Sequence, residues 1–501
     1  MITVIYSTHK DENYNNKFKQ HLLQTVGLND VQILEFVNHN QYSLSQVYNS
    51  GITQSIYNIV VCCHNDIKLE KNWGKKLLED YSNNPEFGII GKAGSCYFPE
   101  SGVYWERLSQ TMVGQVYHHP EGQKKWLNKY SPKLPFIIPV VTIDGLFMSF
   151  DKTKCTHFFD ETIGKFHFYD HLFCIPNYLN GVKIGVTSSF EITHESVGKP
   201  NQEFWESKDK FVEKWGEKLP LDLKPSSPYA PEIKRKNFKK FGKVAIIIPT
   251  KGKVEMLKDC VDSFYEHCDK DKYDIFVADT GSTEEEKKWI KENINHINLI
   301  EYDYYNFAKI NNDVVKNLPI NVYDFLLFSN NDIKILNDVI TGMLSVFESS
   351  KFAGTVGCRL HFEDNTIQHD GVHMGFRQSN SSIAVDHINF RNYYNYSNTT
   401  KEVFGNTGGL MMVRKTVFEN NGMFNENYIS CFEDVEFNLI LNSTGLKNYV
   451  CSECVAYHYE STTRNEDPEN LNKLKHDYIA NLVPSFKKNL EKIKHKLVII
   501  K

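Results

Sequence analysis

Short apolar runs alternate with longer amphipathic stretches along most of the chain. In the second half, the runs that predict buried strands are Val244–Ile248, Asp274–Ala278 and Asp324–Phe328. Between the first two runs, the stripe of a helix packed on a sheet is formed by Leu257, Val261, Phe264 and Cys268. The first half begins likewise, with runs at Ile2–Tyr6, Gln32–Phe36 and Asn58–Cys62. This alternation predicts an α/β fold with a mostly parallel, Rossmann-like sheet in each half.

Four positions recur in the two halves at nearly equal separations. They are Asp66, Gly145, Asp170 and His194 in the first half, and Asp332, Gly409, Asp434 and His458 in the second. The separations are 79, 25 and 24 residues in the first set and 77, 25 and 24 in the second. The surrounding segments also match, as in VVCCHNDIKLE against FLLFSNNDIKIL. Such internal similarity indicates two copies of one fold.

A proline-containing segment separates the two halves. Residues 219–243 hold four prolines followed by a basic run, which is typical of an interdomain linker. We therefore predict domains at 1–218 and 244–465, and a basic helical tail at 466–501. The apolar positions of the tail at helical intervals are Leu482, Phe486, Leu490, Ile493 and Leu497. Two interpretations of the tail stay open: it lies on an anionic membrane surface, or it docks on the second domain.

Length and composition narrow the class of protein. At 501 residues the chain is longer than one hydrophobic core usually organises, and 41% apolar with 24% charged residues is ordinary for a globular protein. The net charge of −5 gives no indication of a nucleic-acid partner. No secretory signal or membrane-spanning run is found, and eleven scattered cysteines suit a reducing compartment. We expect a cytoplasmic protein, with any membrane contact made through the tail at the inner face.

Acidic and amide residues follow the third apolar run of the second half. Asn330 and Asp332 come directly after this run, at the end of a predicted strand, which is where open α/β sheets bind ligands. A carboxylate there suits Mg²⁺ or Mn²⁺, which takes one or two protein oxygens and keeps its other positions for water and phosphate. Such an ion would bridge the diphosphate of a nucleotide-sugar and stabilise it as a leaving group.

The other two recurring polar residues suit acid–base and metal chemistry. Asp434 begins an amphipathic stretch, so we expect it at a helix N-terminus, held as a base for an attacking hydroxyl. His458 follows a short strand, where a neutral imidazole completes a metal shell or contacts a diphosphate. Taken singly, these residues also have ordinary explanations as turn formers, helix caps or core histidines. Their joint repetition favours the functional interpretation.

The second half resembles the family 2 glycosyltransferases with the GT-A fold, particularly their rhamnosyltransferase-like members, from Val244 to about Arg464. The segments that carry the resemblance are IIIPTKGK, VADTGST, YNFAKINND, SNNDIKIL, GCRLHFEDNTIQHDGVHMG, FEDVEF and YHYESTTR. It implies Asp434 as the catalytic base. The implied metal ligands are Asn330, Asp332 and His458, and the implied nucleotide-sugar contacts are Thr250, Asp279, Asn331 and Glu433.

The first half resembles the same family more loosely, over residues 2–219. There the implied base is Asp170, the implied metal ligands are His64, Asp66 and His194, and the implied nucleotide contacts are Thr8 and Asn65. A tyrosine replaces the glutamate of the base motif, and VADTGST has no evident counterpart. From Thr8 to Asp66 is 58 residues, whereas from Thr250 to Asp332 is 82. We therefore expect a reduced nucleotide site in the first half.

The resemblance implies a bifunctional, inverting glycosyltransferase. It would use UDP- or dTDP-sugars with Mn²⁺ or Mg²⁺ to extend a surface glycan, and a lipid-linked acceptor would suit a tail at the membrane. In one alternative, only the second domain is catalytic, and the first binds the acceptor or serves as a scaffold. In another, the chain is a nucleotidyltransferase that makes sugar nucleotides. Against this second alternative, neither half has a triphosphate-binding loop rich in glycine and lysine after its first strand.

Overall fold

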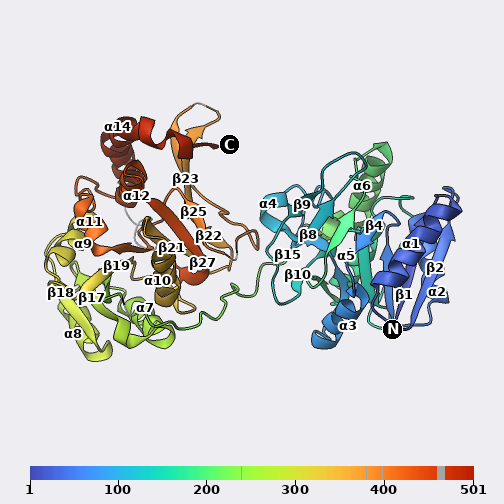
Figure 1. The fold of residues 1–501 in the computed structure, drawn as a ribbon, viewed down its shortest axis with the longest axis horizontal. Helices are drawn as coiled ribbons and strands as arrows, with labels where there is room; N and C mark the ends of the chain where they lie inside the picture. Colours follow the sequence, from blue (N-terminus) through green and yellow to red (C-terminus); the bar gives the residue numbers. More distant parts are fainter. Residues whose placement is uncertain (239, 380, 398, 460–468, 501) are drawn as a thin grey trace. The chain divides into compact units, whose positions relative to one another are not determined.

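The computed structural model of the chain forms two compact units of mixed α/β structure (Figure 1). It describes residues 1–238, 240–379, 381–397, 399–459 and 469–500. The first unit comprises Met1–Pro225 with Asn392–Asn395, and the second comprises Ser226–Arg391 with Tyr396–Lys501. The predicted α/β class is thus confirmed for both halves. The division between Pro225 and Ser226 falls inside the segment predicted as a linker.

A seven-stranded sheet forms the centre of the first unit. In spatial order its strands are β10 (Ile138–Val140), β13 (Lys183–Val186), β5 (Phe87–Gly91), β12 (Phe147–Asp151), β3 (Ile59–Cys63), β1 (Ile2–Thr8) and β2 (Val31–Val37). A second sheet contains β11 (Thr142–Ile143), β6 (Ala93–Ser95), β8 (Met112–His118), β14 (Ile192–His194), β4 (Ile67–Leu69) and β9 (Trp126–Lys129). The strands β7 (Tyr97–Phe98) and β15 (Leu221–Asp222) pair with each other. The helices are α1 (Glu12–Thr25), α2 (Leu44–Gln54), α3 (Trp73–Asn83), α4 (Leu108–Thr111), α5 (Tyr169–Leu179) and α6 (Gln202–Trp215).

The second unit is built on a ten-stranded sheet. Its main path is β18 (Ile297–Glu301), β17 (Tyr273–Asp279), β16 (Lys243–Thr250), β19 (Tyr323–Ser329), β26 (Leu410–Arg414), β21 (Ala353–His361), β27 (Lys447–His458) and β20 (Ile333–Ile335). Off this path, β22 (Ile367–His369) pairs with β21 and β25 (Lys401–Val403) pairs with β27. A separate three-stranded sheet has the order β24 (Ile383–His387), β23 (Val372–Arg377) and β28 (Val498–Ile500).

Helices cover both faces of the ten-stranded sheet. The helices of the second unit are α7 (Val254–His267), α8 (Glu284–Asn293), α9 (Phe307–Lys316), α10 (Val339–Ser349), α11 (Lys415–Asn420), α12 (Glu433–Ser443), α13 (Asn470–His476) and α14 (Val483–Ile493). Of these, α7 and α10 pack on one face of the sheet, and α9, α11 and α12 pack on the other. In β16, Val244, Ile246 and Ile248 pack in the cluster that contains α7, whereas Ala245 and Ile247 pack in the cluster that contains α9. Burial on both faces explains why the strand is a continuous apolar run rather than an alternating one.

The two central sheets repeat one arrangement. The order β2-β1-β3-β12-β5-β13 in the first unit matches β17-β16-β19-β26-β21-β27 in the second, with the same parallel and antiparallel pairings. The pairing of β4 with β14 likewise matches that of β20 with β27. Between the second and third strands of the sheet, the second unit contains α8 and β18 in addition to α9, whereas the first contains only α2. This extra helix–strand pair explains why Thr250 and Asp332 are 82 residues apart, whereas Thr8 and Asp66 are only 58 residues apart.

The C-terminal helices pack on the second unit. Leu482, Phe486 and Ile493 are buried in one apolar cluster with Met374 and Leu439, and α14 lies against α12 (Figure 1). The segment then forms β28, which pairs parallel to β23. The apolar face considered for membrane contact is therefore covered by protein, as the docked interpretation of the tail requires. Among the described residues, no helix is long and apolar enough to cross a membrane.

Candidate active sites

Three side chains of the first unit that can bind a metal lie close together. His64 and Asp66 occupy the turn between β3 and β4, and His194 ends β14, where it pairs with Ile67. His194 Nε2 is 3.4 Å from Asp66 Oδ2, and His64 Nδ1 is 3.9 Å from Asp66 Oδ1. One ligand atom from each residue lies within 4.8 Å of the others. This is a spacing that a single divalent ion can bridge.

The same turn of the second unit holds Asn330 and Asp332 beside His458. The register pairs Ile333 with His458, as it pairs Ile67 with His194 in the first unit. His458 Nε2 is 3.2 Å from Asp332 Oδ1 and 3.1 Å from Asn330 Nδ2. The other ring nitrogen, Nδ1, is 2.7 Å from the amide oxygen of Gln368. Donation from Nδ1 to this oxygen leaves Nε2 unprotonated, so that its lone pair can accept from Asn330 Nδ2.

Burial and neighbouring groups shift the pKa values of His64 and Asp66 in the first cluster. Burial lowers the pKa of His64, and the attraction of Asp66 offsets this only in part. Burial alone would raise the pKa of Asp66, but the hydrogen bond and charge interaction with His194 outweigh it and hold the pKa below the usual range. A carboxylate beside an uncharged imidazole is the form in which both groups bind metal.

The carboxylate of Asp434 is held by two backbone N–H groups. Asp434 lies in the first turn of α12, directly after Phe432–Glu433, and Phe432 adopts the left-handed conformation with φ 77°. Its Oδ2 accepts from Gly408 N at 2.6 Å and its Oδ1 accepts from Val435 N at 2.7 Å. Because both oxygens are engaged, the side chain has one orientation.

Asp170 is held in the same way at the start of α5. The preceding Phe168 is left-handed with φ 66°. The Oδ2 atom of Asp170 accepts from Gly145 N at 2.9 Å, and its Oδ1 atom accepts from His171 N at 2.9 Å. The residue between Phe168 and Asp170 is Tyr169, whose hydroxyl is 2.9 Å from His64 Nε2. Its counterpart Glu433 is buried at the first position of α12.

One dipeptide in each unit joins the helix-borne aspartate to the candidate metal cluster. Gly408 N binds Asp434, and the adjacent Gly409 O accepts from Asn330 N at 2.9 Å. In the first unit, Gly145 N binds Asp170 and the next residue accepts from His64 N at 3.1 Å. The helix-borne aspartate and the candidate metal cluster are thus neighbours in both units.

The sheet register corrects one pairing expected from the sequence. Cys63 pairs with Phe147, and Ser329 pairs with Leu410. The structural counterpart of Gly145 is therefore Gly408 and not Gly409. The similarity of DGLFM to GGLMM favoured an alignment shifted by one residue, whereas the backbone hydrogen bonds fix the true one.

A threonine–asparagine hydrogen bond repeats beside each cluster. Asn65 Nδ2 donates to Thr8 Oγ1 at 2.8 Å, and Asn331 Nδ2 donates to Thr250 Oγ1 at 2.9 Å. Both threonines are buried at the carboxyl end of the first strand of their sheet. This bond fixes the candidate metal turn to the strand end where a nucleotide is expected.

The two units differ at the end of the second strand. The register pairs Thr250 with Asp279 but Thr8 with Val37. Asp279 is fully buried, and its Oδ1 accepts from the backbone N–H and the hydroxyl of Ser282. Its Oδ2 has no hydrogen-bond partner among the described residues, so an acceptor is left over at this position. Val37, by contrast, offers only an apolar side chain.

Each unit has a cavity at its cluster. The cavity of the first unit has a volume of about 520 Å³ and extends from the candidate metal cluster to Asp170. His64 and His194 line one part of it, and the aromatic side chains of Tyr104, Trp105 and Phe166 line another. The cavity of the second unit, of about 440 Å³, is lined by Lys253, Glu255, Met256, Asp259, Asp332, Ile333, Lys334 and Tyr459. This lining combines two lysines with three carboxylates. Glu460–Arg464 of the segment YHYESTTR lie outside the described residues.

Family models match both halves of the chain. A model described as "Glycosyltransferase like family" matches residues 3–215, and one described as "Glycosyl transferase family 2" matches residues 245–422. The chain carries two family 2-type glycosyltransferase domains in tandem. The sequence resemblance led us to expect the GT-A fold, and the mostly parallel sheet repeated in the two domains agrees with that expectation.

Individual relatives match part of the chain. The "O-antigen biosynthesis protein RfbC" of Myxococcus xanthus is 27% identical over 239 residues, which are 45% of this chain and 18% of that protein. The "Uncharacterized protein y4gI" of Sinorhizobium fredii (strain NBRC 101917 / NGR234) is 22% identical over 235 residues, 45% of this chain and 25% of that protein. The matches therefore span about a fifth to a quarter of the length of these relatives. Among solved structures, "GalNAc-T7 with UDP, GalNAc and Mn2+" aligns over 52% of this chain and 55% of that chain, with 10% identity and a TM-score of 0.37.

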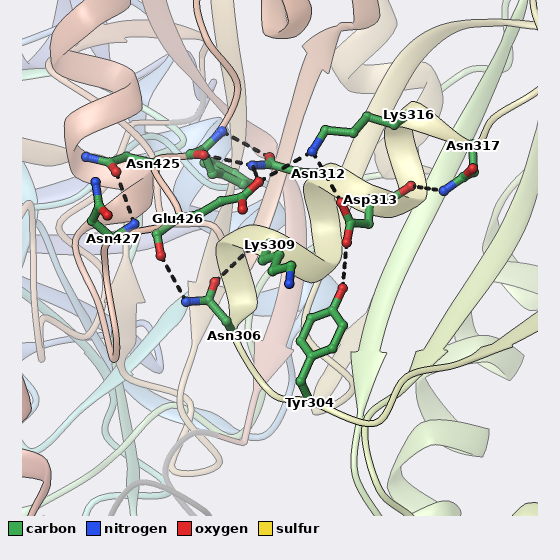
Figure 2. Close-up of polar contacts among 11 residues, drawn as sticks. Tyr304, Asn306, Lys309, Asn312, Asp313, Lys316, Asn317, Asn425, Glu426 and Asn427 are labelled. Carbon is green, nitrogen blue, oxygen red and sulfur yellow. Dashed lines mark hydrogen bonds and ion pairs between the residues drawn. The ribbon is translucent and has the colours of Figure 1, made fainter.

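Asparagines of α9 bind the loop that leads to the aspartate of the second domain. Asn312 Nδ2 donates to Phe424 O at 2.8 Å and to Glu426 Oε1 at 3.0 Å, and Asn312 Oδ1 accepts from Phe424 N at 3.1 Å. Asn306 Nδ2 donates to Glu426 O and Tyr428 O at 3.1 and 2.9 Å. Figure 2 shows both asparagines directed at Glu426. These contacts give the YNFAKINND segment a structural role.

The first glycosyltransferase domain has the same contact, which the sequence comparison missed. Asn49 of α2 donates to Phe159 O at 2.8 Å and to Glu161 Oε1 at 2.7 Å, and it accepts from Phe159 N at 3.1 Å. The signal was present, because Ser43 and Asn49 have the same spacing as Asn306 and Asn312, and Ser43 and Asn306 are the N-caps of α2 and α9. The shortening of the first domain therefore lies mainly between Val37 and Ser43.

The contrast between Asp279 and Val37 predicts different nucleotide binding by the two domains. We expect Asp279→Ala to weaken UDP or dTDP binding to the second domain at least about tenfold, because a hydrogen bond to a carboxylate is lost. Val37→Ala is the matched control and should leave both affinities unchanged. Calorimetric titration of the full chain with each nucleotide measures this. Unchanged affinity in Asp279→Ala would contradict the assignment.

Proposed function

We propose that the second domain transfers a sugar from a nucleoside-diphosphate donor to a hydroxyl of a growing glycan, with inversion at the anomeric carbon. The observation that carries this proposal is the Gly408–Gly409 connection, which places the oriented carboxylate of Asp434 next to Asp332 and His458. A base next to a metal-binding cluster is what displacement of a diphosphate requires. The role that the Myxococcus relative's name gives it, in O-antigen biosynthesis, supports a surface glycan as the product.

Asn330, Asp332 and His458 would hold a divalent ion. A carboxylate oxygen and an imidazole nitrogen are ligands that Mn²⁺ accepts, and Mg²⁺ accepts the oxygen. When bound, the ion would neutralise charge on the departing diphosphate. His64, Asp66 and His194 offer the first domain one carboxylate and two imidazoles for the same purpose.

The chain's own residues supply orientation and proton transfer. Thr250 and Asn331 fix the turn on which the donor would lie, and Asp279 offers its unused oxygen to the nucleoside. Asp434 accepts the proton of the acceptor hydroxyl as that oxygen bonds to the anomeric carbon. On the opposite face the bond from this carbon to the diphosphate breaks, and the nucleoside diphosphate leaves with its electron pair. Glu433 would contact the bound donor beside the base.

We further propose that the first domain transfers a second sugar, which makes the chain bifunctional. Its support is the cavity that connects His64 and His194 with Asp170. Because Val37 replaces the carboxylate of Asp279, its donor would be held with fewer contacts to the nucleoside, through Thr8 and Asn65. The same replacement favours the alternative, in which the first domain only binds the acceptor or positions the second.

Purified protein incubated with a panel of UDP- and dTDP-sugars and Mn²⁺ tests the proposed function. Release of nucleoside diphosphate from one donor, and its loss with EDTA, is the expected result. An Asp279→Ala variant serves as the control for the nucleotide site. If no donor is hydrolysed and neither UDP nor dTDP binds, the proposal is wrong.

A further inference from the structure

The direction of each proposed base depends on the loop before its helix. We name these base loops Phe159–Phe168 in the first domain and Phe424–Phe432 in the second. Each ends on a phenylalanine in the left-handed conformation, with φ 66° at Phe168 and 77° at Phe432. That conformation is unfavourable for a residue with a side chain, and neither phenylalanine can cap the helix with a side-chain hydrogen bond. Other contacts must therefore hold the base loops.

In the second domain, one buried carboxylate binds the end of the base loop. Asp477 is fully buried and accepts N–H groups from three consecutive residues. The donor–acceptor distances are 3.0 Å from Ile429, 2.7 Å from Ser430 and 3.1 Å from Cys431. Hydrogen bonds of this kind, from neutral N–H groups to a charged acceptor, are among the stronger ones in proteins. Asp477 thus fixes the backbone directly before Phe432.

The first domain has an equivalent carboxylate from a different stretch of sequence. Glu203, in the first turn of α6, accepts from Lys165 N at 3.0 Å and from Phe166 N at 3.3 Å. Lys165 precedes Phe168 by three residues, as Ile429 precedes Phe432. Glu203 follows His194 by nine residues, whereas Asp477 follows His458 by nineteen. The contact is therefore repeated in space although the sequence spacing is not.

An aromatic residue follows each carboxylate and packs on the left-handed phenylalanine. The ring centroid of Phe204 is 5.1 Å from that of Phe168, and the ring centroid of Tyr478 is 6.3 Å from that of Phe432. Farther along each segment, Phe211 joins the apolar cluster of α5, and Phe486 joins that of α12. The carboxylate and its neighbour therefore hold both the backbone and the side chain at the turn into the helix.

We propose that Asp477 and Glu203 are positioning residues, which act on transfer by fixing the base loops and thereby the carboxylates of Asp434 and Asp170. This inference rests on the proposed function, because it takes those aspartates as bases. Asn312 and Asn49 secure the start of each base loop, and the positioning carboxylates secure its end. Apart from Glu433 on α12, the residues proposed to bind the nucleotide and the metal of the second domain lie on other elements, so the main effect of Asp477 and Glu203 is expected on kcat and not on donor binding.

Steady-state kinetics of Asp477→Asn and Glu203→Gln in the full chain test this inference. Each variant keeps the side-chain volume and removes the charge that binds the N–H groups. We expect kcat of the linkage made by the affected domain to fall about tenfold to a hundredfold, since small displacements of a catalytic group have effects of this size. The KM for the donor should change far less than kcat, and the rate of the other linkage should stay at its wild-type value. Matched controls are Glu491→Gln on α14 and Glu213→Gln on α6, both exposed.

Amide hydrogen exchange of residues 429–431 and 165–166 gives a readout that does not need activity. Faster exchange confined to these residues, with at most a small fall in melting temperature, is expected for the positioning variants. Wild-type kcat in both variants would overturn the inference. It would also be overturned if kcat, nucleotide affinity and melting temperature all fell strongly together, because that would indicate general loss of structure. Should Asp477→Asn fail to fold, Glu203→Gln on the less buried α6 decides the question. An inactive wild-type chain would instead show that the proposed function is wrong.

Discussion

Asp434→Asn is expected to lower kcat of the second-domain linkage about a thousandfold while nucleotide binding stays unchanged. The amide keeps the hydrogen bond from Gly408 N but cannot take a proton from the acceptor hydroxyl, and loss of a general base has effects of this order. Product analysis by mass spectrometry with each donor measures the linkage, and calorimetry measures the nucleotide affinity.

Asp170→Asn is the matched variant for the first domain. If both domains transfer sugars independently, each variant abolishes one linkage and spares the other. Loss of both linkages in either single variant would contradict independent active sites. Wild-type products in Asp170→Asn, with a loss in Asp434→Asn, would identify the first domain as a non-catalytic module.

Removal of divalent ions is expected to abolish both linkages, with Mn²⁺ restoring them. Asp332→Ala should cost the second-domain linkage at least about a hundredfold in kcat/KM at low Mn²⁺, because only an imidazole and an amide remain near the diphosphate. Asp66→Ala should have the same effect on the first-domain linkage. Activity at a series of free Mn²⁺ concentrations, with inductively coupled plasma analysis of bound metal, measures both effects.

The ligands of the two clusters predict different metal preferences. The first cluster offers two imidazole nitrogens, whereas the second offers one. Because Mg²⁺ binds nitrogen poorly, replacing Mn²⁺ by Mg²⁺ should reduce the first-domain linkage about tenfold more than the second. Equal activity of both linkages without any divalent ion would contradict a metal role for either cluster.

The apolar runs and the repeated spacing predicted much of the fold and of the candidate site. The run Val244–Ile248 lies in β16 and is buried on both faces. Near-equal spacing identified Asp170 and Asp434 as counterparts because β4, β5 and β12 of the first domain correspond to β20, β21 and β26 of the second. The geometric neighbours predicted around Asp66 and Asp332 do lie together, while their roles stay predictions.

Other features could not be predicted, because they depend on backbone pairing or on contacts remote in sequence. The pairing of β1 with β2 shows that Val37 occupies the position of Asp279. The sequence alone did not show this, because the first domain lacks the counterparts of α8 and β18 and the similarity is lost at that point. The carboxylates Glu203 and Asp477 lie at different distances from the histidine motif, so no fixed pattern includes them. The sheet register likewise decides that Gly408, and not Gly409, is the counterpart of Gly145.

The dependence of Asp434 on a helical segment farther along the chain bears on how such domains are inherited. The family 2 match ends at residue 422, before Asp434, His458 and Asp477. A genetic exchange at that limit would transfer the residues proposed to bind the nucleoside, Thr250, Asp279 and Asn331, and leave the proposed base behind. An exchange at Pro225–Ser226 would keep the second compact unit whole. For these domains the smallest module that can be recombined with its chemistry intact is therefore larger than the segment by which the family is recognised.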